Sequence, residues 1–326
     1  MRVCCQSTLF VMAFALFFSS CQPHGSQPST PAEGKKFLFT FVIYGSPGNP
    51  TWTKVVAGAR EAADALGCTV DIQYAQDDPV RQNDIIETAI GNRTDGVAIS
   101  LNLDDAYDVT VKKARDLRIP VIAFNNDDSQ GAAGNARMAF IGQNEEAAGY
   151  VIAKRLIEVY QLKSGDHVVC PVEYPEAVYA ILRYRGVRRA FEEVGISSEV
   201  LGTGAVSHED NLNRLTQYLL GHTETDAILA MGGYPMSVAP QAAADVGRAG
   251  LPNAGFDITQ AIARNIAEGK TLATVDQKPF YQGFFSVSQL YHYKKYGLEP
   301  CDINTGGGLI DKDNIAKVME LSDSIR

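Results

Sequence analysis

Short apolar runs alternate with amphipathic segments along the part of the chain that follows residue 35. An apolar run bounded by polar residues predicts a strand that is buried on both faces, and apolar residues at every third or fourth position predict a helix. Strands are predicted at 36–44, 70–74, 96–100 and 120–124, and helices at 53–66, 81–91 and 105–117. This alternation is typical of βαβ units on a parallel sheet.

The alternation then restarts with a second series of similar size. Helices are predicted at 144–160, 177–194, 211–221, 237–249 and 280–296, and strands at 167–170, 200–204, 227–231 and 271–275. Two such series predict an α/β protein with two doubly wound parallel-sheet lobes.

The N-terminus has the pattern of an export signal. Arg2 precedes an apolar run, Leu9–Phe18, that is too short to span a bilayer as a helix. Small residues then precede Cys21, which resembles the lipobox of bacterial lipoproteins, although Phe18 departs from its usual leucine. We therefore expect a signal peptide at 1–20, lipidation of Cys21 and a flexible Pro/Ser/Gln/Gly-rich tether at 21–35. Ordinary cleavage near Ser20 is the alternative.

Composition restricts the classes of partner. Hydrophobic residues make up 45% of the chain and charged residues 21%, which is typical of a soluble globular protein. The formal net charge of −9 argues against nucleic acid, because phosphate binding needs clustered Lys and Arg. The one dense basic cluster is Arg183, Arg185, Arg188 and Arg189, and its last two members fit a solvated helix face.

Three cysteines, Cys68, Cys170 and Cys301, lie in the body of the chain. An odd number at wide spacing is neither a disulfide framework nor a metal-ligand pattern. We expect buried small hydrophobic residues, leave open whether one pair forms, and predict neither a metal nor a cofactor.

Ligands of open parallel sheets bind beyond the carboxyl ends of the strands, and polar or aromatic residues follow several predicted strands. The candidates at such positions are Asn49, Trp52, Asn125, Asn126, Asp257 and Gln277. Carboxylates and amides suit vicinal hydroxyls, an indole ring can stack on a sugar, and a guanidinium such as that of Arg183 offers a fork of donors. This set matches a neutral polyol better than a phosphate or a peptide.

Several segments together carry a family resemblance across residues 37–315. They include GSPGNPTWTKVVAGA at 45–59, IPVIAFNND at 119–127, AFIGQNEEAAGYVIAKRL at 139–156, RYRGVRRAF at 183–191 and ATVDQKPFYQGFFSV at 273–287. In their order and spacing the chain resembles a type I periplasmic sugar-binding protein of the ribose/galactose class. It is most similar to the branch that takes pentoses, polyols and the furanosyl autoinducer.

The resemblance implies a role for each matching position. The implied ligand contacts are Asn49, the aromatic platform Trp52, Asn125, Asn126, Gln143 and Asn144 near the first lobe crossing, Arg183, His208, Asp257 and Gln277. Two positions depart from the ribose binders, which often carry Arg where this chain has Asn126 and usually carry an Asn contact near Gly232–Tyr234. Both departures argue against ribose itself.

The resemblance also implies the architecture and the partners. Three chain crossings are expected near Gly142, Gln277 and Gly307, which form a three-segment hinge. The implied lobes are 36–142 plus 278–307 and 143–277 plus 308–326. The implied protein is a monomeric, extracytoplasmic solute-binding component of an ABC importer, which closes on its ligand and meets the permease subunits.

Alternative functions differ in how well they agree with the sequence. An enzyme is disfavoured because the sequence has no nucleophile elbow, P-loop, HExxH or dinucleotide-binding motif. A transcription regulator of the same fold would carry a DNA-binding segment where this chain has its signal and tether. A receptor-coupled sensor stays open, as does a nucleoside or autoinducer ligand, for which Tyr174 and Tyr234 are candidate stacking residues.

Overall fold

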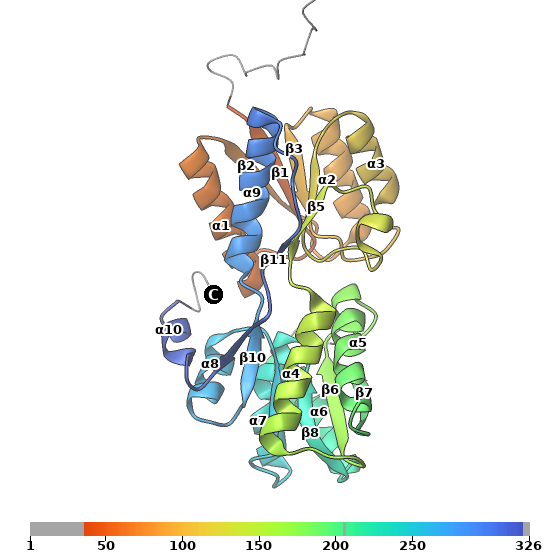
Figure 1. Cartoon of the computed structure of the whole chain (residues 1–326), viewed down its shortest axis with the longest axis vertical. Coiled ribbons are helices and arrows are strands. Elements are labelled where there is room, and N and C mark those ends of the chain that lie inside the picture. Colours follow the sequence, from red (N-terminus) through yellow and green to blue (C-terminus); the bar gives the residue numbers. More distant parts are fainter. Residues whose placement is uncertain (1–35, 205–206, 322–326) are drawn as a thin grey trace, which may run out of the picture.

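The structure, a computed structural model, describes residues 36–204 and 207–321. These residues form two α/β lobes stacked end to end along the long axis (Figure 1). The expected signal peptide, the tether and Cys21 lie outside the described residues.

The first lobe contains a six-stranded, wholly parallel sheet in the order β11-β5-β4-β3-β1-β2. Its strands are β1 (Leu38–Ile43), β2 (Thr69–Tyr74), β3 (Gly96–Ile99), β4 (Val121–Asn125), β5 (Ala139–Gly142) and β11 (Ile303–Asn304). Its helices are α1 (Pro50–Leu66), α2 (Pro79–Gly91), α3 (Asp108–Asp116), α9 (Pro279–Tyr296) and the 3-10 turn η1 (Gly131–Ala133). Side chains of α1 and α9 pack on one face of the sheet, and those of α2 and α3 pack on the other.

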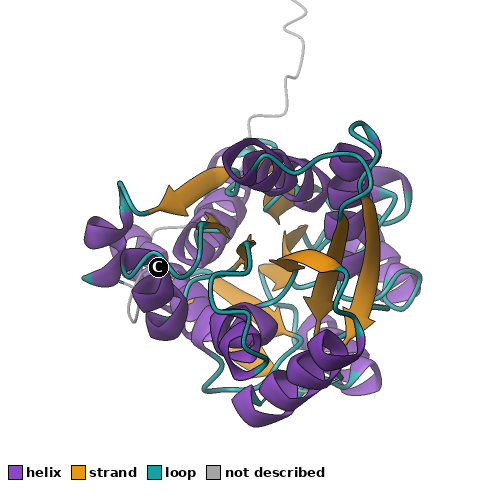
Figure 2. Cartoon of the chain, turned by 90° about the horizontal axis from the view of Figure 1, so that it is seen from below, coloured by secondary structure: helices purple, strands orange, loops and turns teal. Residues whose placement is uncertain are grey.

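The second lobe repeats this plan in the order β12-β10-β9-β8-β6-β7. Its strands are β6 (His167–Val172), β7 (Ser197–Gly202), β8 (Thr225–Ala230), β9 (Asn253–Phe256), β10 (Ala273–Asp276) and β12 (Gly308–Asp311). Its helices are α4 (Glu145–Tyr160), α5 (Val178–Glu192), α6 (His208–Gly221), α7 (Gly233–Asp245), α8 (Gln260–Ala267) and α10 (Ile315–Met319). Viewed along the long axis, helices surround the strands (Figure 2).

Each lobe brings two helices into close contact through a pair of glycines. A Cβ atom on Gly58 of α1 would lie 1.9 Å from the carbonyl oxygen of Phe280, and one on Gly283 of α9 would lie 1.9 Å from that of Val55. Gly149 of α4 and the facing glycine of α5 stand in the same relation. Side chains larger than a hydrogen atom would separate these helices, whose first turns carry residues at the junction of the lobes.

The chain passes between the two sheets three times, from β5 to α4, from β10 to α9 and from β11 to β12. The predicted fold class, two doubly wound parallel-sheet lobes, is confirmed. Short elements such as β5, β9 and α8 were not predicted, because segments of four to eight residues are too short to show a clear periodicity.

One cysteine prediction is wrong. Cys68 and Cys170 are buried as expected, but Cys301 is exposed, and all three are free thiols. Cys301 belongs to the turn between α9 and β11, where its backbone N–H donates to Gln289 Oε1 at 2.7 Å, so the loop presents its thiol to solvent.

The hydrophobic cores of both lobes consist of residues from Phe37 to Met319. The chain from residue 36 onward therefore holds the packing that stabilises the fold. No helix within 36–204 and 207–321 is both long and apolar enough to cross a membrane.

Candidate functional site

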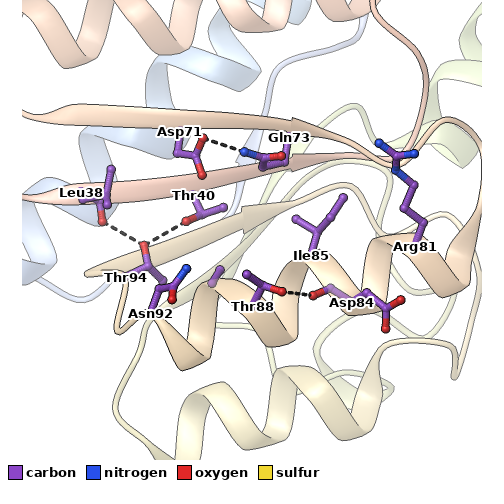
Figure 3. Close-up of a pocket in the computed structure, with 11 residues that line it drawn as sticks. Leu38, Thr40, Asp71, Gln73, Arg81, Asp84, Ile85, Thr88, Asn92 and Thr94 are labelled. Atoms are coloured by element: carbon purple, nitrogen blue, oxygen red, sulfur yellow. Dashed lines mark hydrogen bonds between the residues drawn. The ribbon is translucent and has the colours of Figure 1, made fainter.

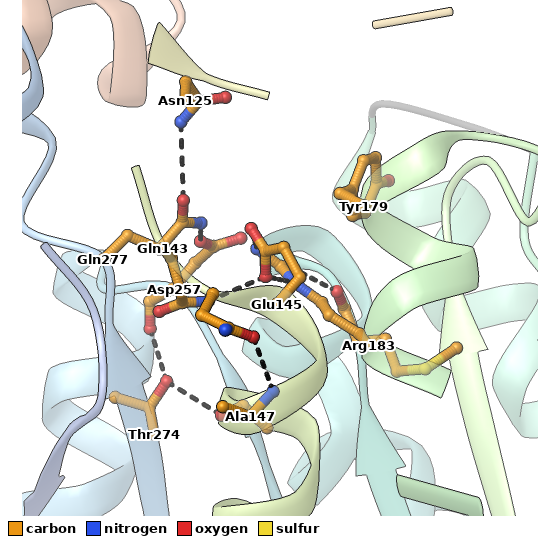
Figure 4. A network of polar contacts seen from close by, with 12 residues as sticks. Asn125, Gln143, Glu145, Ala147, Tyr179, Arg183, Asp257, Thr274 and Gln277 are labelled. Carbon is orange, nitrogen blue, oxygen red and sulfur yellow. Dashed lines mark hydrogen bonds and ion pairs between the residues drawn. The ribbon is translucent and has the colours of Figure 1, made fainter. Parts of the chain in front are cut away.

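Amide side chains join the two lobes where the carboxyl ends of their strands face each other (Figure 4). Asn125, the last residue of β4, donates from Nδ2 to Gln282 Oε1 at 2.9 Å and to Gln277 Oε1 at 3.4 Å. Gln277 in turn donates from Nε2 to Asp257 Oδ1. A continuous polar chain therefore runs from the first sheet, through a crossing segment, to the second.

Asn125 and Asp257 occupy equivalent places in the two lobes. Asn125 ends β4 and Asp257 directly follows β9, and each of these strands is the third in its sheet. Both residues have left-handed backbones, with φ of 63° and 71°. Asn and Asp tolerate this conformation better than other side-chain-bearing residues do, and it turns both side chains toward the junction.

A buried ion pair lines the side of the junction that the second lobe provides, which we call the wall of that lobe. Arg183 is 2% exposed; it donates from Nε to Glu145 Oε2 at 2.7 Å, from Nη2 to Glu145 Oε1 at 3.2 Å and from Nη1 to the Met231 carbonyl at 2.6 Å. Its guanidinium also stacks 4.2 Å from the ring centroid of Phe256. Burial alone would lower the pKa of Arg183, but the facing carboxylate of Glu145 raises it above its ordinary value.

Gln143 extends this network toward the first crossing. It is 1% exposed and donates from Nε2 to Glu145 Oε2 at 2.8 Å. Its Oε1 atom has no hydrogen-bond partner among residues 36–204 and 207–321. A buried amide oxygen that accepts no hydrogen bond costs folding free energy. This atom can therefore accept a hydrogen bond from a bound molecule.

A second carboxylate, Glu173, lies beside this wall. It directly follows β6, is 6% exposed, and accepts from the Tyr234 backbone N–H at 2.9 Å and from the Tyr179 hydroxyl at 3.4 Å. Burial raises the pKa of Glu173 above its usual range. Sequence reasoning missed this residue, although its position at the carboxyl end of a strand is the same signal that singled out Asn125.

Lys54 of α1 was also missed. It is 3% exposed, and its Nζ donates at 3.1 Å to the carbonyl oxygen of Ile258, which lies in the other lobe. The available signal was a lysine beside Val55 and Val56, on a helix that follows the first strand.

Two predicted residues act as helix caps. The Oδ1 atom of Asn49 accepts from the Thr51 N–H at 2.9 Å and that of Asn144 accepts from the Ala147 N–H at 2.9 Å. Both side chains are exposed at the first turns of α1 and α4. Each also lies on a segment that borders the junction of the lobes.

The other predicted residues lie near this network. Trp52 is 7% exposed and meets Phe124 edge to face, with ring centroids 6.4 Å apart. Asn126 donates to Asn102 Oδ1 at 3.1 Å. His208, the exposed first residue of α6, lies edge to face with Tyr234 at 5.3 Å.

Of the ten predicted residues, the structure thus joins Asn125, Gln277 and Asp257 directly, and Gln143 with Arg183 through Glu145. A separate hollow of about 330 Å³ lies between α2 and the strands β1 and β2 (Figure 3). Only the first lobe lines it. Within the described ranges, no group of three His, Cys, Asp or Glu residues is placed to hold a metal ion.

The model of the periplasmic binding protein domain family matches residues 39–298, most of the chain. The chain belongs to this family. The relatives named below and the family itself are binding proteins rather than enzymes.

Two curated relatives match this chain over most of their own length. A xylose/arabinose-binding protein, XylF, of Sulfolobus acidocaldarius is 25% identical over 283 residues, which cover 82% of this chain and 69% of the relative. A D-ribose/D-allose-binding protein of Pseudomonas aeruginosa is 27% identical over 231 residues, which cover 70% of this chain and 72% of the relative.

Solved structures share the fold at lower identity. A carbohydrate transporter of Acidothermus cellulolyticus in complex with myo-inositol aligns with a TM-score of 0.79 at 23% identity, over 89% of this chain and 99% of that one. A solute-binding protein of Burkholderia graminis in complex with D-arabinose aligns with a TM-score of 0.77 at 22% identity, over 87% and 98%.

Proposed function

We propose that this protein binds a neutral sugar or polyol between its two lobes and delivers it to an ABC importer. The observation that carries the proposal is the polar chain from Asn125 through Gln277 to Asp257. Its amides and carboxylate supply both donors and acceptors from both lobes, and each hydroxyl of a sugar is both donor and acceptor. The relatives named for xylose, arabinose, ribose and allose support the same ligand class.

The charges at the junction favour a neutral ligand. Arg183 is occupied by Glu145, and Lys54 donates to a backbone carbonyl. Glu173 and Asp257 add carboxylates on the same side. A phosphate or carboxylate ligand would be desolvated against these two carboxylates, which is unfavourable.

Trp52 and Gln143 complete the proposed contacts. An indole near the start of α1 offers an apolar surface to a sugar ring, and the unpartnered Oε1 of Gln143 offers an acceptor to a hydroxyl. The departures from ribose binders at Asn126 and Tyr234 favour a pentose, hexose or polyol other than ribose. Asn49, Asn144 and His208 are proposed as contacts at the rim.

Closure on the ligand is proposed to follow from the three crossings. A ligand that contacts both lobes stabilises the closed arrangement, which the permease subunits then recognise. Lys54, which donates to the carbonyl of Ile258 in the other lobe, contributes to the same arrangement.

The proposal includes export and anchoring. Residues 1–20 act as the signal peptide, Cys21 carries the lipid, and residues 21–35 link it to a monomeric body of lobes 36–142 plus 278–307 and 143–277 plus 308–326. The protein is a carrier rather than an enzyme. Cys21→Ala should release the protein from the membrane fraction, and mass spectrometry of the wild type should show a diacylated N-terminal cysteine.

The decisive experiment is a thermal-shift screen of residues 22–326 against pentoses, hexoses, pentitols, inositols and nucleosides, followed by calorimetry on the hit. A ligand at about 1,000 times its Kd adds roughly 4 kcal/mol to the free energy of unfolding.

A pair of variants tests the site itself. Asp257→Ala should lower affinity about 100-fold, because a half-buried charged hydrogen-bond partner is lost. Glu224→Ala, an exposed change in the same lobe, is the matched control. No shift with any sugar or polyol would refute the proposal.

A further inference from the structure

The end of the first lobe that lies farthest from the hinge is at the top of Figure 1. The parallel strands of this lobe all begin at this end, so the turns that precede β1, β3, β4 and β11 meet there. We call this surface the distal face; it is formed by Lys36, Arg93, Leu117, Arg118 and residues 294–298. Phe37 and Tyr291, with ring centroids 5.7 Å apart, join the start of β1 to the end of α9.

The distal face gathers five cations in an acidic protein. Its cations are Lys36, Arg93, Arg118, Lys294 and Lys295. Among the acidic residues at this end, Asp116 pairs with Lys112 at 2.7 Å and Asp302 pairs with Arg137 at 3.3 Å, whereas Asp64 and Glu299 are exposed and offset part of the positive charge. Lys36, Arg93, Arg118 and Lys294 form no ion pair within the described ranges.

Two of these arginines stand where the backbone favours glycine. Arg93 and Arg118 follow α2 and α3 with φ of 56° and 59°, in the left-handed region. Three turns between helix and strand in the second lobe place Gly195, Gly247 and Gly269 in that region, and a fourth places Gln161 there. A side chain in this conformation costs folding free energy. The shape of the turns therefore does not explain why arginine rather than glycine stands at these two positions.

Exposed apolar and aromatic side chains accompany the cations. Leu117, Tyr296 and Leu298 are 58%, 53% and 59% exposed. Lys295 donates to the Tyr291 hydroxyl at 2.8 Å and stands 5.1 Å from the rings of Tyr291 and Tyr296. Tyrosine and leucine next to Lys and Arg are typical of surfaces that lie at a lipid–water interface.

The corresponding end of the second lobe has the opposite character. Its turns carry the exposed acidic residues Glu193, Glu224, Asp226 and Glu268. Lys270 is paired with Glu268 at 2.7 Å. The turns of the second lobe also carry the cations Lys163 and Arg248, but its acidic side chains outnumber its cations, whereas four cations of the distal face form no ion pair among the described residues.

We propose that the distal face of the first lobe docks on an anionic lipid bilayer. The chain enters this lobe at Lys36, within the distal face, so the proposed lipid at Cys21 is attached on the same side. The intervening 15 residues span at most roughly 50 Å when fully extended. Docking through this end would make the long axis of the protein point away from the membrane. The junction of the lobes would then stay open to solvent.

This inference goes beyond sugar binding and uses the proposed anchor only for its reach, so it is tested without the lipid. Residues 22–326, which include both cores, are floated with vesicles of phosphatidylcholine alone or mixed equally with phosphatidylglycerol. We expect binding to the anionic vesicles and its loss in about 0.5 M salt, because surface charges are then screened. Each cation removed should weaken binding about five-fold.

The test variant is Arg93→Gly/Arg118→Gly, which removes two charges and suits the left-handed backbone. We expect a melting temperature that is unchanged or raised, unchanged sugar affinity and about 25-fold weaker binding to anionic vesicles. The matched control, Lys163→Ala/Lys270→Ala in the second lobe, should bind vesicles as the wild type does.

Four results would overturn the inference. The first three are no binding to anionic vesicles at low salt, equal binding to both kinds of vesicle, and full binding by the arginine variant. A dimer that forms through the distal face, detected by sedimentation and lost in the same variant, would also overturn it in favour of a second copy. Loss of sugar binding with vesicle binding intact would instead count against the proposed function alone.

Discussion

The two lobes share a backbone plan and differ in the chemistry they place on it. Both have six strands in the equivalent order, both bring a helix pair together through glycines, and both have a left-handed residue at the third strand, Asn125 or Asp257. The first lobe then builds its wall from amides, with Asn125 bonded to Gln282. The second builds it from the ion pair of Glu145 and Arg183. The topology determines where side chains converge, and the residue types determine what they can hold.

One difference in topology has a simple geometric cause. Every strand of the two sheets except β12 runs toward the hinge, and β11 does so in parallel with β5. β12 begins at the hinge directly after β11 and must run away from it, so it pairs antiparallel with β10. A short crossing thus supplies one edge strand to each lobe.

The largest expected effect is a difference in the free energy of unfolding between variants of the ionic wall in the second lobe and of the amide wall in the first. Arg183→Met should lower the free energy of unfolding by about 3–5 kcal/mol, because Glu145 is left buried without its partner. Gln282→Met in the first lobe should cost about 1–3 kcal/mol, because only neutral hydrogen bonds are lost. Urea unfolding of both variants measures the difference. Equal costs would mean that the walls do not differ energetically.

An exposed arginine of the same helix provides the control for charge. Arg189 pairs with Glu146 at 2.9 Å on the surface, so Arg189→Met should change stability by less than about 1 kcal/mol. A cost comparable to that of Arg183→Met would show that helix α5 is sensitive to any loss of arginine.

An intermediate effect is expected for the contact between the lobes. Lys54→Met removes the hydrogen bond to the Ile258 carbonyl, and a charged hydrogen bond contributes about 1.5–3 kcal/mol. We expect roughly ten-fold weaker sugar binding and a larger radius of gyration in small-angle scattering, because the closed arrangement loses a contact. Lys112→Met, on the surface of the same lobe, should change neither quantity.

The smallest effect concerns pH and the buried carboxyl of the second lobe. Because burial raises the pKa of Glu173 in the folded state, the unfolded chain releases its proton first as the pH rises, and the fold loses stability across that interval. Glu173→Gln should therefore raise the melting temperature by roughly 2–4 °C at pH 7. The gain should vanish below the pH at which an ordinary carboxyl ionises. A gain that persists in acid would exclude ionisation as its cause.

Long periodic segments were predictable and short ones were not. Helices such as α1, α4 and α9 have enough turns for their apolar positions to show a repeat, whereas β9 and α8 do not. Asn125, Asp257 and Gln277 were found as polar residues that follow strands. Glu173 follows a strand in the same way and was overlooked, and Lys54 lies within a helix, where no strand-end rule applies.

The sequence by itself determined the two βα series, the doubly wound lobes and the polar strand ends, because periodicity and strand-end position are local properties of the chain. Only the tertiary structure decided that Arg183 is occupied by Glu145, that Lys54 donates to the carbonyl of Ile258, and that Arg93, Arg118 and Lys36 share one surface. These relations join residues far apart along the chain. They depend on how the strands are ordered in each sheet and how the two lobes face each other, which no local pattern encodes.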